Sequence, residues 1–526
     1  TYTGTVSQVR IQYNVNDGAW QDVVTTTAGS FGNGSYDWQV RDNISGNVNV
    51  RVLDADSGHP QSETIDSAQF AIKGYLKAGV PVAGALWTAL ETNKPITWSA
   101  VGTPLAGLFD NVKIDYTTNA SSGTPTWTPV IASTANISST NNSYTWPTVA
   151  DVVSDDCKIR VAGLAADSLH NNVIAESGIF TIRGWVDVIS PVTGTKLTVT
   201  QTPVKIRWNK SNAVNKVAIY YRINAGAWVP IDTAYSGGGG QGWYDYDWTV
   251  PDAISNNVEV RVVDRTDESL YLSGNSYEDL SGIFKIKGEI SSVGKPQAGS
   301  VLLVSDGDTL TTGDAETITW TKKGSIASYK VDISTNGITG TYYEARSSTA
   351  GINMGSYIST TFEVPITTSS NCIIRISDLS DSTEVSNTSA AFTIRNRLIL
   401  DKTPINDKTF IVGDALNGIV PITWTNRGTI PAVEVHYSKI GDFTDALLLQ
   451  TINPNNAHNA QKGWPWTIEN NRDTFPAKTG RIRVRQVTDT NVYDINDLGF
   501  KIRGQITVVT PTNGDVWVVG ENKYVT

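Results

Sequence analysis

A short closing pattern, Ser-x-x-Phe-x-Ile followed by Lys or Arg, constrains the fold of this chain more than any other feature. Its copies lie roughly 100 to 110 residues apart, about the length of one small β-sandwich. The five copies centre on Phe70, Phe180, Phe284, Phe392 and Phe500. The last copy has Asp497 in the place of the serine. This spacing predicts a tandem array of small domains rather than one large catalytic fold.

Other patterns recur in a fixed order between these copies. Each full repeat opens with Pro-x-x-Gly-x-x-apolar, as at Pro191, Gly194 and Leu197, and Pro404 with Asp407 forms a variant. Strands of alternating polarity follow, without the 3.6-residue apolar period of a helix. About seven strands around a buried Trp predict an all-β chain that is a tandem array of immunoglobulin-like β-sandwich domains.

The closing copies also predict the domain boundaries. The expected domains are residues 1–73, 74–183, 184–287, 288–395 and 396–503 (repeats 1 to 5), followed by the start of a further domain at 504–526 (the tail). Repeat 1 and the tail align with only part of a repeat, so we expect both to be truncated domains of a longer protein. No Gly/Ser-rich linker separates neighbouring repeats, which predicts a semi-rigid rod.

Composition excludes some classes of function and bounds the cysteine chemistry. The net charge of −10 argues against nucleic-acid binding, and no apolar run approaches the roughly 20 residues of a membrane helix. Cys157 and Cys372 align with inward Val and Ile residues of other repeats. We therefore expect two buried single thiols and no disulfide. Few cysteines and a single Met fit a secreted bacterial surface protein.

The motif order resembles a known group of immunoglobulin-like repeats. The best matches are Ile318-Thr319-Trp320, the run from Tyr246 to Asp252, and the run from Ser281 to Ile286. This group is the Ser/Thr-rich membrane-anchored, cell-wall-synthesis type, which occurs in fungal wall proteins and long bacterial surface proteins. The resemblance covers essentially the whole chain and implies a role at the cell envelope, as in surface-layer or stalk proteins. It carries no catalytic motif.

Aromatic residues suggest a carbohydrate contact, although most of them align between repeats. Aligned tryptophans are predicted to be core. Trp243, beside Tyr244 and a four-glycine loop, is the candidate for an exposed contact with carbohydrate. The aligned sets are Trp98/208/320/424, Trp38/146/248/466, Trp20/127/228 and Trp87/517.

Acidic loops suggest calcium, the one cofactor that we consider. Asp306, Asp308, Asp314, Asp378 and Asp381 lie in such loops, and Ca²⁺ takes six to eight oxygen ligands. The alternative is that these aspartates cap turns and keep the surface hydrated.

A strand arginine recurs in every repeat and alternates with inward Val and Ile, so it should point outward. We expect it to pair with a carboxylate of the neighbouring strand, such as Asp115 or Asp332, and a contact between subunits is the alternative. In repeat 5 the aligned arginine is Arg485, and His436 is expected on a solvated face.

Sequons at Asn119, Asn136 and Asn141 are candidate glycosylation sites, although sequons also arise by chance in so Asn- and Ser-rich a chain.

These observations predict a structural protein and not an enzyme, since no catalytic or phosphate-binding motif occurs. The first interpretation is a self-assembling surface-layer protein on the outside of the cell, with other copies of itself and cell-envelope glycans as partners. The alternatives are an adhesin or stalk spacer, and a carbohydrate-binding accessory region of a larger secreted protein.

Overall fold

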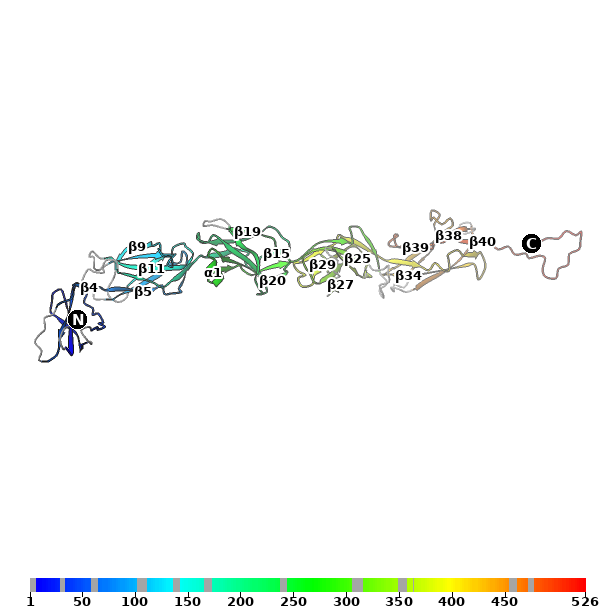
Figure 1. The fold of residues 1–526 in the computed structure, drawn as a ribbon. Coiled ribbons are helices and arrows are strands. Elements are labelled where there is room, and N and C mark those ends of the chain that lie inside the picture. Colours follow the sequence, from blue (N-terminus) through cyan, green and yellow to red (C-terminus); the bar gives the residue numbers. More distant parts are fainter. Residues whose placement is uncertain are drawn as a thin grey trace. The chain divides into compact units, whose positions relative to one another are not determined.

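Strands make up nearly all the regular structure of the chain in the computed structural model (Figure 1). The structure describes residues 6–28, 34–57, 65–101, 111–135, 142–164, 173–236, 244–304, 316–348, 357–362, 364–453, 461–471 and 477–526. Within these ranges one short helix, α1 (Glu268–Ser273), interrupts the all-β pattern. The chain divides into two compact units. The first is residues 1–197, 201–250 and 255–285, and the second is residues 198–200, 251–254 and 286–526.

The strands of repeats 1 to 3 follow the predicted order. Repeat 1 contains β1 (Gln8–Val15), β2 (Gln21–Thr27), β3 (Ser45–Asp54) and β4 (Phe70–Ile72). Repeat 2 contains β5 (Tyr75–Val80), β6 (Leu86–Thr88), β7 (Thr92–Val101), β8 (Asn111–Thr117), β9 (Thr128–Ala135), β10 (Asn142–Thr148), β11 (Ser154–Leu164), β12 (Ile174–Glu176) and β13 (Phe180–Arg183). Repeat 3 contains β14 (Val186–Ser190), β15 (Lys196–Thr198), β16 (Val204–Lys210), β17 (Val217–Ile223), β18 (Val229–Tyr235), β19 (Tyr244–Trp248), β20 (Ser255–Asp264), β21 (Glu278–Leu280) and β22 (Phe284–Lys287).

Repeats 4 and 5 have the same succession of strands. Repeat 4 contains β23 (Glu289–Lys295), β24 (Val301–Leu303), β25 (Glu316–Lys323), β26 (Tyr329–Ser334), β27 (Tyr343–Ser348), β28 (Tyr357–Phe362), β29 (Ser369–Asp378), β30 (Ser386–Thr388) and β31 (Phe392–Arg395). Repeat 5 contains β32 (Arg397–Leu400), β33 (Thr409–Ile411), β34 (Ile419–Arg427), β35 (Val433–Ser438), β36 (Leu447–Ile452), β37 (Gln461–Thr467), β38 (Ala477–Gln486), β39 (Tyr493–Ile495) and β40 (Phe500–Arg503).

Two sheets form each of repeats 2 to 5. In repeat 2 the small sheet is ordered β10-β7-β5 and the large sheet β6-β13-β11-β8-β9, with β12 also paired to β11. The same order recurs in repeats 3, 4 and 5. Two sheets that pack their apolar faces together form a sandwich, which confirms the predicted tandem immunoglobulin-like array. Repeat 1 has one described sheet, ordered β2-β1-β3-β4.

The opening Pro-x-x-Gly pattern marks the point where the chain crosses between sheets. In repeat 2 it connects β5 of the small sheet to β6, which pairs in parallel with the closing strand β13. Gly84 and Gly194 adopt positive φ angles of 74° and 81°, which an L side chain rarely adopts. The variant in repeat 5 has Asp407 at this position with a φ of 55°, and Asp is one of the few other residues that tolerate it.

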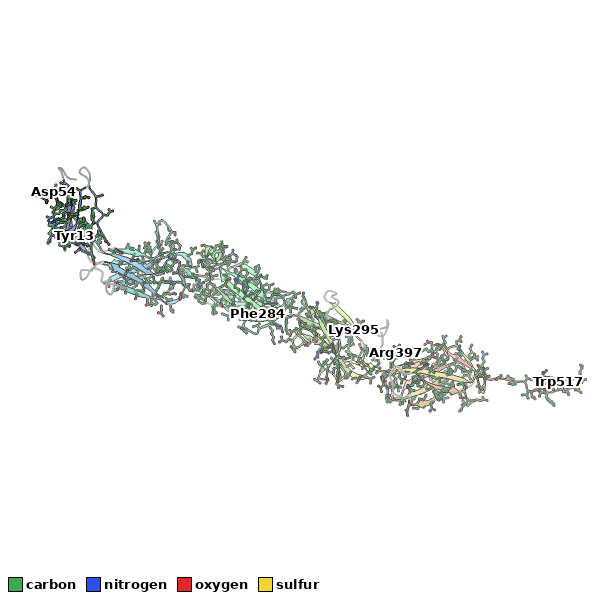
Figure 2. The ribbon with its side chains drawn as sticks, turned by 90° about the horizontal axis from the view of Figure 1, so that it is seen from below. Tyr13, Asp54, Phe284, Lys295, Arg397 and Trp517 are labelled. Carbon is green, nitrogen blue, oxygen red and sulfur yellow. The ribbon has the colours of Figure 1, made fainter. Side chains whose placement is uncertain are left out.

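The core of each sandwich combines the Trp of the small sheet with the Phe of the closing strand. Trp98, Trp208 and Trp424 are almost wholly buried, and Phe284 lies in the interior of repeat 3 (Figure 2). Burying one such side chain contributes about 2–3 kcal/mol. The core prediction for the aligned pair Trp87/517 is wrong for Trp517, which is 39% exposed in the tail, where no strand forms.

Both cysteines are free and buried, as predicted. Burial raises the pKa of the Cys157 thiol to about 11, which keeps it protonated and unreactive near neutral pH.

The serine of the closing pattern satisfies a backbone amide of the neighbouring strand. The Ser177 hydroxyl accepts a hydrogen bond from the Ile159 amide at 3.0 Å and donates one to the Gly178 carbonyl at 2.8 Å. Ser67, Ser281 and Ser389 make the same contacts. The serine therefore completes the ladder where β11 changes its partner from β12 to β13.

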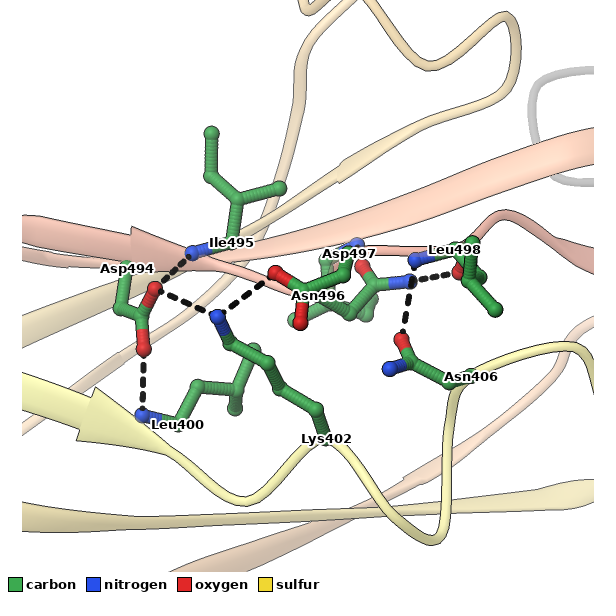
Figure 3. A network of polar contacts seen from close by, with 9 residues as sticks. Leu400, Lys402, Asn406, Asp494, Ile495, Asn496, Asp497 and Leu498 are labelled. Atoms are coloured by element: carbon green, nitrogen blue, oxygen red, sulfur yellow. Dashed lines mark hydrogen bonds and ion pairs between the residues drawn. The ribbon is translucent and has the colours of Figure 1, made fainter.

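Repeat 5 departs from the predicted alignment. Asn496, not Asp497, accepts the amide of Ile482, at 2.7 Å. Asp497 instead pairs with the Lys402 ammonium at 2.8 Å, beside a hydrogen bond from the Asn496 amide to Leu498 (Figure 3). The expected place of Asp497 is wrong because this repeat has one more residue between the amide-binding side chain and Phe500.

None of the helical structure in the described part of the chain has the length and hydropathy of a membrane span.

Candidate functional site

The strand arginine of repeat 2 lies on the outer face of the large sheet, directly opposite Asp115. Antiparallel pairing of β11 with β8 places Arg160 beside Asp115, and their Nη2 and Oδ2 atoms are 2.8 Å apart. Lys113 Nζ lies 3.1 Å from the other carboxylate oxygen, and Arg160 Cζ lies 4.3 Å from the centre of the Trp127 ring. The Asp115 side chain is only 1% exposed. The predicted pairing is confirmed, and the buried carboxylate is held by two cations under an aromatic ring.

Repeat 4 repeats this arrangement. Arg375 Nη2 lies 2.9 Å from Asp332 Oδ2, and Lys330 Nζ lies 3.0 Å from Oδ1. The Tyr342 ring takes the place of the tryptophan, with Arg375 Cζ 4.0 Å from its centre. The predicted pair of Asp332 with the strand arginine is therefore also confirmed.

Repeats 1 and 3 keep the arginine and the aromatic ring but replace the aspartate. In repeat 1 the side-chain oxygen Oε1 of Gln12 accepts a hydrogen bond from Arg51 Nε at 2.9 Å, and Arg51 Cζ lies 4.1 Å from the Trp20 ring centre. In repeat 3 Arg261 lies over the ring of Tyr220. Burial and a hydrogen bond with Tyr271 raise the pKa of Tyr220 to about 12.

The outer aromatic rings correct one prediction. Trp20, Trp127 and Trp228 align between repeats and were expected in the core, but each is half-buried and lies over the guanidinium of its strand arginine. Their alignment reflects a recurring contact on the outer face rather than a place between the sheets.

In repeat 5 a histidine stands where repeats 2 and 4 have aspartate. Pairing of β35 with β38 places His436 opposite Arg483, so Arg483 and not the predicted Arg485 is the equivalent strand arginine. Arg483 Cζ lies 4.5 Å from the Phe443 ring centre. Glu434 pairs with Arg485 at 2.5 Å, and lies 3.6 Å from His436.

The expected solvated position of His436 is wrong, because its side chain is buried among these neighbours. Burial, followed by repulsion from Arg485 and Arg483, lowers the pKa of His436 below its ordinary value. The imidazole is therefore neutral near pH 7 and contributes no charge opposite Arg483.

The predicted carbohydrate contact is only partly visible. Trp243 lies outside the described residues. Tyr244 is half-buried, stacks on Trp208 with ring centres 6.3 Å apart, and has Lys210 Nζ 4.3 Å from its own ring centre. Its ring is thus engaged within repeat 3.

The predicted calcium ligands are not brought together among the described residues. Asp306, Asp308 and Asp314 lie outside them. Asp378 Oδ1 accepts hydrogen bonds from the amide and hydroxyl of Ser380, at 2.9 and 2.6 Å, and so caps a turn. Within the described ranges, no group of three or more His, Cys, Asp or Glu side chains is arranged to hold a metal ion. The calcium site stays a prediction, as does the role of Asp381.

Of the three candidate glycosylation sites, only Asn119 is described. It is half-buried, and its side-chain carbonyl accepts hydrogen bonds from the Thr117 hydroxyl at 2.7 Å and the Thr126 amide at 2.9 Å. Asn136 and Asn141 lie outside the described residues.

Side chains of neighbouring repeats interlock at the joint between repeats 2 and 3, inside the first compact unit. Asp151 accepts hydrogen bonds from the amides of Asn212 and Ala213, at 3.0 and 3.2 Å. A Cβ atom on Gly184, the first residue of repeat 3, would lie 2.2 Å from Val214 of the same repeat and 3.3 Å from Val153 of repeat 2, so the boundary is too closely packed for a larger residue. These contacts leave no free linker at this joint.

The joint between repeats 4 and 5, inside the second compact unit, uses different residues at the same place. Arg395, at the end of repeat 4, pairs with Asp489 at 3.1 Å. Asn396 replaces the glycine and donates hydrogen bonds to the Thr429 carbonyl at 2.9 Å and to Gln486 at 3.1 Å. Sequence reasoning found the short connection but not these contacts, because the partners are more than 30 residues away along the chain.

Comparison with known proteins gives structural similarities alone. No protein-family model matches the chain, and no curated protein matches it. A four-repeat segment from the extending region of a large adhesion protein is 14% identical to this chain, with a TM-score of 0.30. The alignment covers 80% of this chain and 98% of that segment. An ectodomain fragment of ICAM-5 is 9% identical, with a TM-score of 0.29. The alignment covers 82% of this chain and 100% of that fragment.

The fibronectin(III)-like modules of CbhA from Clostridium thermocellum are 16% identical, with a TM-score of 0.14. The alignment covers 40% of this chain and 94% of the chain that contains those modules. Identities and TM-scores this low do not transfer any property of these proteins to this chain.

Proposed function

We propose that this chain is a structural protein of the cell exterior whose sandwiches act as a spacer with restrained joints. The observation that carries the proposal is the joint between repeats 2 and 3, where Asp151 binds two amides of the next repeat and Gly184 leaves no room for a side chain. A joint fixed by both neighbours transmits force and holds distance, whereas a flexible linker would let each domain reorient.

The joint between repeats 4 and 5 supports the same function. Arg395 of repeat 4 pairs across it with Asp489 of repeat 5, and Asn396 at the boundary is anchored to repeat 5, although these residue types differ from those at the first joint. The two joints are held by different side chains at equivalent positions. They therefore share a restrained connection between neighbouring repeats rather than one sequence motif.

The finer proposal is a self-assembling surface-layer protein, with an adhesin or stalk spacer as the second candidate. Both need restrained joints, and only the surface layer also needs contacts between copies. The outer face of repeat 5 favours the surface layer, because Arg483 has no aspartate opposite it. The carbohydrate-binding interpretation has less support, since Tyr244 is covered by Lys210 and stacked on Trp208.

A scattering experiment tests the spacer proposal. The variant Asp151→Ala with a Gly/Ser segment inserted after Arg183 removes the restraint at one joint. We expect its distribution of interatomic distances, from small-angle X-ray scattering, to be broader than that of the native chain. A control with the same Gly/Ser segment inserted in the tail should match the native chain.

An equally broad distribution for the native chain would contradict the spacer proposal. The exterior location is tested separately, by labelling intact cells with a reagent that does not cross membranes. Protection of this protein from the label in intact cells, but not in lysed cells, would contradict that location.

A further inference from the structure

The outer face of the large sheet in repeat 5 combines cationic and apolar side chains. Strand register places Leu448, His436, Arg483 and Ile495 in one row across β36, β35, β38 and β39. Arg481 lies two residues before Arg483 on β38, and Tyr493 lies two residues before Ile495 on β39, opposite Arg485. We call this set, with Phe443 stacked on Arg483, the repeat 5 face.

Two guanidinium groups of the repeat 5 face are not neutralised. No carboxylate of the described residues forms an ion pair with Arg481 or Arg483, and Glu434, which lies 3.6 Å from His436, pairs with Arg485. In repeats 2 and 4 the equivalent arginine has a buried aspartate within 3 Å. Arg483 therefore has no carboxylate opposite it on this face, whereas the equivalent arginine of repeats 2 and 4 has one.

Apolar side chains lie in this row and in the neighbouring row of Arg485, and they remain accessible. Leu448 is 48% exposed and Tyr493 is 51% exposed. Arg and Tyr are the residue types most enriched where proteins bind one another tightly, and a surrounding of apolar groups strengthens a charge pair by excluding water. The composition of the repeat 5 face is therefore that of a protein-binding surface for an acidic partner.

The chain itself supplies such a partner. Repeat 5 has 13 basic and 11 acidic residues and is net positive, whereas repeat 1 has four basic and eight acidic residues. In repeat 1 Asp22 on strand β2 accepts a hydrogen bond from Gln12 and lies 3.9 Å from Arg10 Nε, yet its side chain stays 63% exposed, and Asp37 is exposed as well. Opposite charge on two repeats of one chain allows one copy to bind the next.

We propose that the repeat 5 face binds the acidic surface of repeat 1 in a second copy of this chain. The contact joins two different surfaces, so each bound copy leaves one of each free, and assembly continues unless the rotation closes a ring. The proposal rests on the surface-layer form of the proposed function and names the contact that would build it.

The test is salt-dependent self-association of the full chain, followed by sedimentation velocity. We expect the native chain to form oligomers in about 0.02 M NaCl and to dissociate in about 1 M NaCl, where exposed charges are screened. Arg481→Glu with Arg483→Glu should weaken association at least about tenfold, because attraction becomes repulsion. Asp22→Lys with Asp37→Lys should weaken it similarly.

Mixing the two variants gives the decisive result. Each variant alone has like charges on both surfaces, whereas in the mixture each reversed surface finds an opposite one, so we expect association to return. The control Lys408→Glu with Lys523→Glu makes the same change in net charge away from the repeat 5 face, and should associate like the native chain. His436→Asp supplies the aspartate of repeats 2 and 4 without removing an arginine, and should also weaken association.

Other outcomes overturn the proposal in distinguishable ways. Oligomers that persist unchanged in the Arg481→Glu/Arg483→Glu variant would place the contact elsewhere and leave the surface-layer proposal standing. A native chain that stays monomeric at every salt concentration would overturn both the contact and the surface-layer form. The spacer proposal depends on the joints and is tested by scattering alone.

Discussion

Arg160 of repeat 2 and Arg483 of repeat 5 occupy the same position of the same strand but meet different partners. Each lies opposite the central residue of the neighbouring strand, and each has an aromatic ring over its guanidinium. Arg160 binds a buried aspartate, whereas Arg483 faces a neutral histidine. The exchange of aspartate for histidine on the neighbouring strand thus leaves the strand arginine without an opposing carboxylate.

The difference shows how a repeat protein diversifies its surface without changing its fold. The inward residues on either side of Arg160 and Arg483 are buried in both repeats, so replacing the opposing aspartate with histidine leaves the packing of the core unchanged. A position on the outer face can vary because only its immediate neighbours depend on it.

Among changes to the partners of the strand arginine, removing the aspartate should have the largest effect on stability. Asp115→Ala leaves Arg160 and Lys113 without their shared carboxylate, and we expect it to cost about 3 kcal/mol in repeat 2. Gln12→Ala in repeat 1 removes a neutral partner and should cost about 1 kcal/mol. Hydrogen exchange of the amides of β8 and β1 measures each repeat separately. Equal costs for the two variants would contradict the comparison.

Removing the aromatic ring should have a smaller effect. Trp127→Ala exposes Arg160 and should lower the stability of repeat 2 by about 1 kcal/mol. The matched core variant Trp98→Ala should cost about 3–5 kcal/mol, because it leaves a cavity between the sheets. The same exchange measurement compares them. If Trp127→Ala cost as much stability as Trp98→Ala, the placement of Trp127 on the outer face would be contradicted.

The smallest effect should be a pH dependence confined to repeat 5. The folded pKa of His436 is lowered by burial and by Arg485 and Arg483, so the unfolded chain binds the proton first. The contribution of neutral His436 is therefore complete above its ordinary pKa of about 6.5, and is lost as pH falls from there through the folded pKa.

The control for this pH effect is His436→Gln, which supplies the residue that repeat 1 has at Gln12. Exchange of the β35 amides, corrected for intrinsic rates, should show less loss on acidification in this variant than in the native chain. Parallel curves for the two proteins would contradict the assignment to His436.

The outward arginine and its aspartate were predictable because alternation with a period of two assigns each strand residue to a face. Asp115 and Arg160 lie inside regular strands, where this parity holds. Trp127 precedes β9, outside a strand, so parity assigns it to neither face. Its alignment between repeats indicated a shared environment but could not say which one.

The pairing register of β38 with β35 in repeat 5 could not be predicted from the sequence. Arg481, Arg483 and Arg485 all alternate with inward apolar residues, so each could be the arginine opposite His436. Packing decides among them. Gly480 lies opposite Phe500, and a Cβ atom there would be 3.0 Å from the Tyr437 ring and 3.1 Å from the Phe500 ring. The small residue must lie under these rings, which fixes Arg483 opposite His436.

The all-β class, the repeat length, the buried cysteines and the outward direction of the strand arginines could all be predicted from the order of residues. These follow from local periodicity and from patterns that recur at a fixed spacing. Three further features became visible in the folded chain: Trp127 covers an arginine, His436 is buried, and Asp151 binds one repeat to the next. Each of these depends on which distant segments come together, and that is set by packing between strands and repeats.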